Sequence, residues 1–251
     1  IYYTGGDFAE DKKLFDDLKA LAGDVCVEHQ IPENFFYYMA TPPTLFADVA
    51  EKIVKNGMGE EENGNWRRFI FEKPFGHDLA SAMKLNAELR DILDEDQIYR
   101  IDHYLGKETV QNILALRFAN QLFDPLWSSH YVDHVQITMA EDIGLGGRAG
   151  YYDGIGAARD VIQNHLLQLM ALVAMEEPIS FEPKQLQAEK IKVLSATSNI
   201  LPIAENTARG QYGPGWQGSE KVPGLKDEFC FADAATTETY AAIALEVDSR
   251  R

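Results

Sequence analysis

The chain of 251 residues is 45% hydrophobic and carries a formal net charge of −17 at pH 7. A chain of this length can bury one large core or two moderate ones. The excess of acidic residues argues against non-specific binding to nucleic acid or to an anionic membrane. No run of about eighteen apolar residues is present, so no segment is expected to span a bilayer.

The chain ends and the cysteines carry further information. Residues 1–7 lack the basic region and cleavage site of a secretory signal. Residues 239–247 have the pattern of a strand, and neither end is polar as domain edges usually are, so the sequence is interpreted as a fragment of a longer protein. Cys26 and Cys230 are far apart and accompany no ligand cluster, which favours a reducing, cytoplasmic compartment and predicts no metal site.

Strand-like and helix-like patterns alternate over the first hundred residues. Aromatic-rich runs predict strands over 35–40 and 68–71. Helices are expected over 11–21, over 45–54 and from the capping residue Asp78 onward. This alternation is typical of a parallel sheet in a βαβ fold, whose ligands bind beyond the carboxyl ends of the strands. The segments at such ends are 40–43 and 72–74.

The stretch 100–108, with the sequence RIDHYLGKE, concentrates polar chemistry in nine positions. It is interpreted as a strand that ends at Gly106 and leads into a helix, with Asp102 and Tyr104 on one face and His103 on the other. Lys107 would then lie in the first helical turn, where a cation beside unpaired amide groups suits a phosphate. The alternative is a strand end that carries a few surface charges.

The rest of the chain combines helical patterns with short strand-like runs. Helices are expected over 107–123, 156–175 and 183–198, strands over 131–138 and 239–247, and a glycine-rich loop over 206–227. Residues 144–149 match the G-x-G-x-x-A pattern of dinucleotide-binding loops. We reject that interpretation, because the pattern has to open a helix and the turn-rich segment 150–154 follows it instead.

Three further side chains could carry chemistry. His165 shares a helical stretch with Asp160 and Asn164, so it is either a general base beside a cavity or a buried core histidine. Lys73 follows a strand, where it would either meet an anion or a hydroxyl, or lie on the surface before a proline turn. Glu141 also follows a predicted strand and could accept hydrogen bonds from sugar hydroxyls.

These segments resemble the glucose-6-phosphate dehydrogenase family. Residues 100–108 are similar to its nine-residue signature, and 72–76 (EKPFG) to its lysine motif between coenzyme and substrate. Residues 159–168 (RDVIQNHLLQ) are similar to its catalytic helix, and 37–43 and 147–156 also resemble family segments. The matches follow the family order over nearly the whole chain, which is therefore identified as a member.

The resemblance implies a reaction and its catalytic residues. β-D-glucose 6-phosphate would be oxidised to 6-phosphoglucono-1,5-lactone, with hydride transfer from C1 to NADP, at the entry to the oxidative pentose phosphate pathway. His165 would remove the proton of the C1 hydroxyl. Asp102 would fix the tautomer of His165 and stabilise the imidazolium, as the aspartate of a serine-protease triad does.

The resemblance also implies binding residues and partners. The phosphate of glucose 6-phosphate would be bound by His103, Tyr104 and Lys107. Sugar hydroxyls would be bound by Glu141 and Asp160, and the reacting sugar and the coenzyme by Lys73. Further coenzyme contacts would come from Ala40 and Pro42. The whole protein would be a homodimer or homotetramer that binds neither nucleic acid nor membrane.

The sequence departs from the family at both ends. It lacks the glycine-rich Gly-x-x-Gly-Asp-Leu turn that cradles the coenzyme pyrophosphate, and the later strands that complete the substrate domain. The expected fold is therefore α/β plus α+β. Residues 1–99 would form the rear of a Rossmann-like coenzyme domain with a parallel sheet, and residues 100–251 the front of an α+β substrate and dimerisation domain with a large, mainly antiparallel sheet. The alternatives are an inactive fragment of the enzyme, or a catalytically silent relative that senses a sugar phosphate.

Overall fold

The structure, a computed structural model, describes residues 1–7, 12–148, 152–228 and 235–249. It divides into two compact units, Ile1–Asp102 (unit 1) and His103–Arg251 (unit 2). Cys230, the first residue of the helix expected over 11–21, and part of the segment 147–156 lie outside the described residues. No described helix has both the length and the apolar composition that crossing a membrane requires.

Unit 1 is built on a three-stranded parallel sheet with the strand order β1–β2–β3. The strands are β1 (Phe35–Met39), β2 (Arg67–Phe71) and β3 (Ile98–Arg100). The helices are α1 (Lys12–His29), α2 (Phe46–Lys55) and α3 (Leu79–Ile92), with 3-10 turns η1 (Pro43–Leu45) and η2 (Glu95–Gln97). The predicted strands and the parallel βαβ arrangement are confirmed, and the first helix is longer than predicted.

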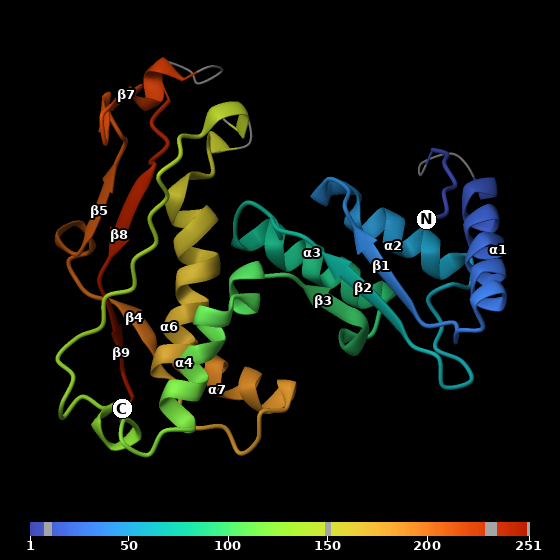
Figure 1. Ribbon diagram of the computed structural model, residues 1–251, viewed down its shortest axis with the longest axis horizontal. Helices are drawn as coiled ribbons and strands as arrows, with labels where there is room; N and C mark the ends of the chain where they lie inside the picture. The colour runs from blue at the N-terminus through green and yellow to red at the C-terminus, as the bar shows by residue number, and fades with distance from the viewer. Residues whose placement is uncertain (8–11, 149–151, 229–234, 250–251) are drawn as a thin grey trace. The chain divides into compact units, whose positions relative to one another are not determined.

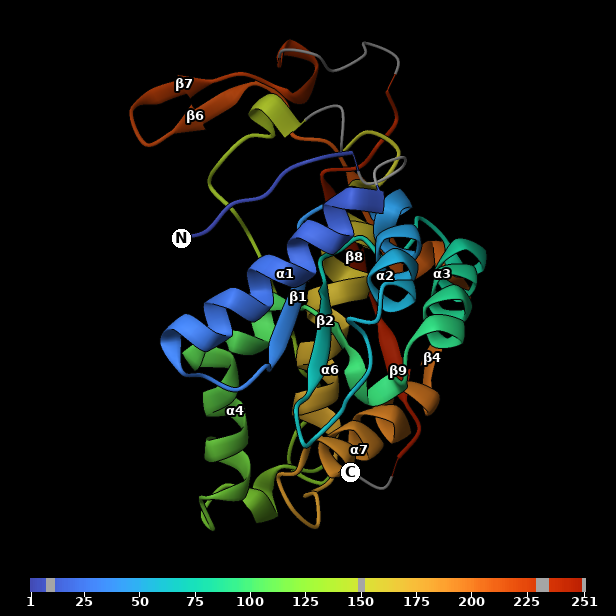
Figure 2. The ribbon, with the colours of Figure 1, turned by 90° about the vertical axis from the view of Figure 1, so that its right-hand side faces the viewer.

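The core of unit 1 lies between the sheet and its helices. Phe69 and Phe71 are fully buried, and because side chains alternate along a strand they share one face of β2. Phe46 of α2 packs edge-on against Phe71, with 5.3 Å between the ring centroids. Figure 2 shows β1 and β2 side by side with α2 beside them. The remaining buried core residues are Phe15, Met39, Val49, Ala50, Ile53, Met58, Leu89, Leu93 and Ile98.

A tight turn joins β2 to α3. Asp78 caps the helix as the sequence predicts, because its carboxylate accepts a hydrogen bond from the Ser81 backbone N–H at 2.8 Å. Gly76 has a φ of +91°, and a Cβ at this position would lie 2.6 Å from the backbone nitrogen of Ala82. Glycine is therefore required here both for the backbone conformation and for the close approach to α3.

Unit 2 begins with a 3-10 turn and is mainly helical up to Ser195. Its helical segments are η3 (His103–Gly106), α4 (Glu108–Phe118), η4 (Asp124–Leu126), η5 (Gly146–Arg148), the π-helix η6 (Ala158–Leu166), α6 (Leu167–Ala174) and α7 (Pro183–Ser195). The helix expected over 156–175 is confirmed, whereas the helix expected over 183–198 ends at Ser195 and is followed by β4 from Thr197. The helix expected over 107–123 is shorter, because α4 begins at Glu108 and ends at Phe118.

The strands of unit 2 pair antiparallel in three two-stranded ladders. The pairs are β4 (Thr197–Asn199) with β9 (Leu245–Val247), β5 (Thr207–Gly210) with β8 (Tyr240–Ile243), and β6 (Gly215–Gln217) with β7 (Glu220–Val222). Short turns η7 (Ile203–Glu205) and η8 (Leu225–Asp227) complete the unit. Within this unit, Figure 1 shows η6 and α6 as one continuous rod beside β8. The predicted combination of an α/β part and an α+β part is confirmed.

The prediction of a strand that continues to Gly106 is wrong, because the strand ends earlier. β3 ends at Arg100, and the Ile101 N–H donates the next sheet-edge hydrogen bond to the Phe71 carbonyl. Residues from His103 onward form the turn η3, so Asp102 and Tyr104 do not share a strand face. Lys107 is the residue preceding α4 rather than part of its first turn.

Two further predictions in unit 2 are wrong. Residues 131–138 alternate in polarity but have no strand partner among the described residues, and a strand exists only through its pairing. The segment 206–227 is not a plain loop, because it contains β5 and the hairpin of β6 and β7. Gly218 serves the hairpin, because it has a φ of +61° in the turn between the two strands.

A buried arginine fastens α4 to the end of α6. Arg117 is fully buried, and its guanidinium donates hydrogen bonds to the carbonyls of Leu172 at 2.5 Å and Met175 at 2.6 Å. The indole of Trp127 donates to the Val173 carbonyl at 2.8 Å. These carbonyls at the helix end need partners from outside the helix, and a cation there also matches the helix dipole. The surrounding core of unit 2 consists of Val110, Leu172, Met175 and Val193.

Replacing Arg117 with methionine is expected to destabilise the protein by about 2–4 kcal/mol, because two charge-assisted hydrogen bonds are lost and buried carbonyls stay unpaired. Urea unfolding followed by circular dichroism measures the change. Arg209→Met, at an exposed position on β5, is the control and should change stability by less than about 0.5 kcal/mol. Equal losses in the two variants would contradict the role assigned to Arg117.

Alanine substitutions at two glycines of unit 1 can distinguish the cost of backbone strain from the cost of steric overlap. Gly64 has a φ of +81°, and a Cβ added there would meet no atom within 4 Å, whereas a Cβ at Gly76 would overlap Ala82. We expect Gly64→Ala to cost about 1 kcal/mol from the left-handed conformation alone. Gly76→Ala should cost about 1–3 kcal/mol more from overpacking. Urea unfolding midpoints of the two variants test this, and equal losses would exclude the overlap.

Candidate active site

The carboxyl ends of the strands in unit 1 gather the residues predicted to bind the coenzyme. Met39 pairs with Phe71 in register, so the segments that follow β1 and β2 leave the sheet at the same edge. Ala40 and Pro42 follow β1 and are exposed, whereas Lys73 follows β2 and is half-buried. This edge is where open parallel sheets bind their ligands.

Thr41 gives this edge an unsatisfied polar group. Its hydroxyl oxygen is buried and has no hydrogen-bond partner among the described residues. A buried hydroxyl left in this state costs about 1–3 kcal/mol, so a ligand that reached it would gain a hydrogen bond. The amide and hydroxyl groups of a nicotinamide dinucleotide could supply such a bond, and the residues present therefore fit this class of coenzyme.

Unit 2 brings three predicted phosphate ligands together with the predicted base. We call His103, Tyr104, Lys107 and His165 the ring cluster. The rings of Tyr104 and His165 are stacked, with 4.1 Å between centroids and 25° between planes. His103 meets His165 edge-on at 4.9 Å and Tyr104 at 4.9 Å. The turn η3 makes this possible, because it presents His103 and Tyr104 from consecutive positions.

His165 is almost completely buried, with 1% of its surface exposed. It lies in the π-helix η6, whose backbone hydrogen bonds join residues five apart, so Asp160 is one π-turn before it. The Asn164 side chain donates to the carbonyls of Arg159 and Asp160, each at 3.4 Å. π-Helical segments occur often at functional sites, and this one carries the polar face that the sequence predicts.

Lys107 provides the positive charge of the ring cluster. Its side chain is exposed, and its ammonium lies 3.6 Å from the centroid of the Tyr104 ring. A cation over a tyrosine ring is held by a cation–π interaction without losing access to solvent. The cluster can therefore offer a cation to an anionic ligand beside the tyrosine ring that stacks on a buried imidazole.

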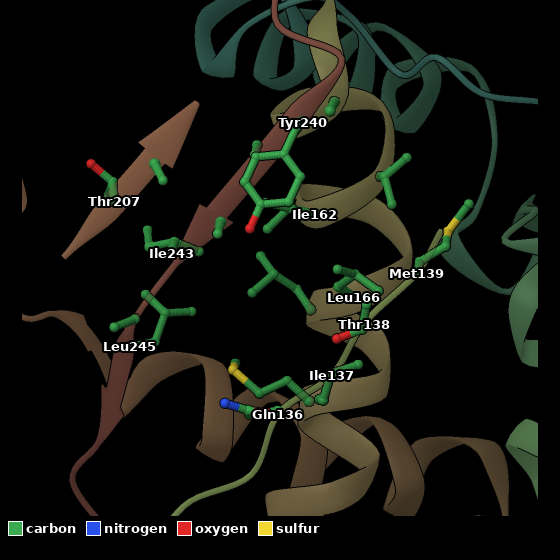
Figure 3. Close-up of a pocket in the computed structure, with 18 of the residues that line it drawn as sticks. Gln136, Ile137, Thr138, Met139, Ile162, Leu166, Thr207, Tyr240, Ile243 and Leu245 are labelled. Carbon is green, nitrogen blue, oxygen red and sulfur yellow. The ribbon is translucent and has the colours of Figure 1, made fainter. Parts of the chain in front are cut away.

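Glu141 and Asp160 lie on a different feature of unit 2. Both line a cavity of about 1540 Å³, larger than the roughly 300–1,000 Å³ of a typical small-molecule site. Figure 3 shows Ile162 and Leu166 of η6 with Tyr240 and Ile243 of β8 around this space. The lining mixes aliphatic side chains with polar ones, and Asp133 and Glu205 add two further carboxylates to it.

Tyr152 also lines this cavity and lies near Asp160. Burial, followed by the negative charges of Asp160 and Glu238, raises the pKa of Tyr152 to about 12. The phenol therefore stays protonated at neutral pH and can act as a donor. It donates a hydrogen bond to the Glu238 backbone carbonyl at 3.1 Å.

The predicted site residues thus fall into groups within each unit. Unit 1 collects Ala40, Pro42 and Lys73 at one sheet edge, and its last residue is Asp102, which the next peptide bond joins to His103. Unit 2 collects the ring cluster, and separately places Glu141 and Asp160 on the cavity wall.

Two polar residues of these sites, Thr41 and Tyr152, were not predicted from the sequence. Thr41 had one usable signal, a hydroxyl placed between two residues expected to contact coenzyme. Tyr152 stands in a turn-rich segment, where no local pattern indicates that its side chain would be buried beside a carboxylate.

Comparisons with known proteins agree on one family across both units. The model for "Glucose-6-phosphate dehydrogenase, NAD binding domain" matches residues 1–112, and that for "Glucose-6-phosphate dehydrogenase, C-terminal domain" matches residues 114–251. Glucose-6-phosphate 1-dehydrogenase 2 of Mycobacterium tuberculosis (strain ATCC 25618 / H37Rv) is 62% identical over 249 residues, 99% of this chain and 48% of that protein. Glucose-6-phosphate 1-dehydrogenase of Bacillus subtilis (strain 168) is 43% identical over 94% of this chain and 48% of its own length.

Solved structures support the same relationship. A glucose-6-phosphate dehydrogenase in complex with its substrate glucose-6-phosphate aligns with a TM-score of 0.87 and 37% identity, covering 99% of this chain and 50% of that chain. The enzyme from Mycobacterium avium aligns with a TM-score of 0.81 and 40% identity over the same shares. The chain spans about half the length of the curated relatives it matches.

Proposed function

The chain belongs to the glucose-6-phosphate dehydrogenase family, and we propose that the polypeptide carrying it oxidises β-D-glucose 6-phosphate to 6-phosphoglucono-1,5-lactone with NADP as hydride acceptor. The observation that supports this most directly is the ring cluster. The Lys107 ammonium lies over the Tyr104 ring and Tyr104 stacks on His165, so a cation that suits an anion and a buried imidazole belong to the same small site. The choice of NADP over NAD rests on the family resemblance.

The proposed mechanism assigns one step to each group. Lys107, with His103 and the Tyr104 hydroxyl, binds the sugar phosphate by charge and hydrogen bonding. His165 removes the proton of the C1 hydroxyl as hydride leaves C1, which avoids a protonated carbonyl. Asp102 orients the imidazole and stabilises its protonated form. The bound coenzyme supplies the hydride acceptor, held through Lys73, Ala40 and Pro42.

Glu141 and Asp160 would accept hydrogen bonds from the sugar hydroxyls in this proposal. Their carboxylates are acceptors only when ionised, which suits hydroxyl donors. The cytoplasmic location, the homodimeric or homotetrameric assembly and the domain boundary at residues 99 and 100 stay predictions.

Replacing His165 with asparagine is expected to lower kcat for coenzyme reduction about 10²–10⁴-fold, because general base catalysis contributes that much. Absorbance of the reduced nicotinamide measures the rate in the polypeptide that carries these residues. Binding of glucose 6-phosphate, measured by calorimetry, should change little. His130→Asn, at an exposed position of unit 2, is the matched control. Unchanged turnover in His165→Asn would remove the imidazole from the mechanism.

Replacing Lys107 with alanine is expected to raise KM for glucose 6-phosphate about tenfold to a hundredfold, because one charge-assisted contact is lost. kcat should change much less, since the phosphate is bound equally in the ground and transition states. The control is Lys226→Ala, an exposed lysine of η8 in the same unit. A fall in kcat with KM unchanged would contradict the assignment of Lys107 to phosphate binding.

The alternative of a silent sugar-phosphate sensor predicts a different result. A sensor needs the phosphate ligands but has no use for a general base, so the buried His165 favours the enzyme. Titration with glucose 6-phosphate and each coenzyme separates the two. Binding without any reduced nicotinamide in the longer polypeptide would favour the sensor.

A further inference from the structure

The stack between Tyr104 and His165 involves a part of Tyr104 that phosphate binding does not use. A phosphate ligand requires the hydroxyl at the ring edge, whereas the stack uses the ring face at 4.1 Å and 25°. Tyr104 is half-buried, and its ring face and its hydroxyl are separate groups that can make separate contacts. The two functions can therefore be separated by substitution.

We propose that Tyr104 is a positioning residue, whose ring face sets the plane of the His165 imidazole for proton abstraction. This inference rests on the proposed function, because it needs His165 to be the general base. It adds to the phosphate contact a second role, carried by different atoms of the same side chain.

The physical need for such a residue comes from the torsion of the histidine ring. Rotation of an imidazole about its Cβ–Cγ bond has broad energy wells, so the helix backbone alone does not fix the ring plane. His165 is enclosed, but enclosure by flexible side chains would still permit the ring to turn. The nearly parallel ring of Tyr104, 4.1 Å away between centroids, covers one face of the imidazole and restricts that rotation.

His103 and Lys107 also contact the Tyr104 ring. His103 contacts both Tyr104 and His165 at 4.9 Å between centroids, so the three rings form one packed group. The Lys107 ammonium lies 3.6 Å from the Tyr104 centroid. A sugar phosphate bound by Lys107 would therefore contact the residue that packs on Tyr104, and Tyr104 in turn stacks on His165. Phosphate binding and the orientation of His165 would then both depend on the Tyr104 ring.

The experiment compares Tyr104→Phe, which keeps the ring and removes the hydroxyl, with Tyr104→Leu, which removes both. The chain is labelled with ¹³C in its histidine rings, and the His165 signal is assigned by its loss in His165→Asn. We expect an order parameter of about 0.85 for the His165 Cε1–H bond in the parent and in Tyr104→Phe. In Tyr104→Leu it should fall below about 0.6. This measurement needs no turnover.

Kinetics of the polypeptide that carries the chain give the second readout. Tyr104→Phe should raise KM for glucose 6-phosphate with little change in kcat, because only a ground-state contact is lost. Tyr104→Leu should in addition lower kcat about tenfold to a hundredfold, the scale expected when a reacting group is misplaced. If Tyr104→Phe keeps its kcat while Tyr104→Leu loses it, the ring face rather than the hydroxyl orients His165.

Several results would overturn the inference. They are a mobile His165 ring in the parent, an unchanged order parameter in Tyr104→Leu, or equal kcat in the two variants. Should Tyr104→Leu fail to fold, Tyr104→Met, whose flexible side chain fills irregular space, is measured instead and judged by the same order parameter. Loss of the proposed function would show as no coenzyme reduction by the parent, while the order parameters would still decide whether the ring is held.

Discussion

The contact between the rings of Tyr104 and His165 is the interaction on which the site of unit 2 depends. An imidazole with 1% of its surface exposed can act as the proposed general base only when its ring is held in a fixed orientation. The stack fixes the orientation from one face, and His103 closes another side. The 3-10 turn at His103–Gly106 is what brings these rings to the helix. A strand continuing in its place would have sent consecutive side chains to opposite faces.

His165 is carried by a continuous helical segment, η6 and α6, whose carboxyl end is held by side chains from elsewhere in unit 2. The π-helix η6 continues directly into α6, and Arg117 and Trp127 hold the carbonyls at the end of α6. Catalytic groups carried on such elements are placed more precisely than groups on loops. The buried guanidinium is a costly group, but the helix-end carbonyls compensate it and give α4 and α6 one fixed register.

The large cavity of unit 2 has a different character from the ring cluster. It lies among η6, β8, β9 and the extended residues 132–141, and its walls mix aliphatic and polar side chains. Its volume exceeds what a single sugar phosphate would fill. Glu141 and Asp160 share this wall with other charged residues such as Arg148 and Glu205, so their proposed contacts with sugar hydroxyls use only part of it.

The sequence by itself determined the local elements and the chemical inventory. The aromatic strands of unit 1, the cap at Asp78 and the helices around His165 follow from patterns within a few residues, because propensity, capping and apolar period are local properties. The family segments RIDHYLGKE and RDVIQNHLLQ could also be identified, because each is a contiguous run of residues. The run 131–138 shows the limit of such patterns, because alternation predicts a strand but only a hydrogen-bonded neighbour makes one.

Only the tertiary structure decided which side chains meet. Nothing in the spacing of residues 104 and 165 predicts a stacked pair, and no local pattern predicts that Arg117 would end inside the core beneath α6. Nor does the apolar period distinguish a π-helix from an α-helix over 158–166, although the two place Asp160 and His165 differently. The physical reason is that these outcomes depend on contacts between segments far apart in the chain, which packing selects and which no short window of sequence contains.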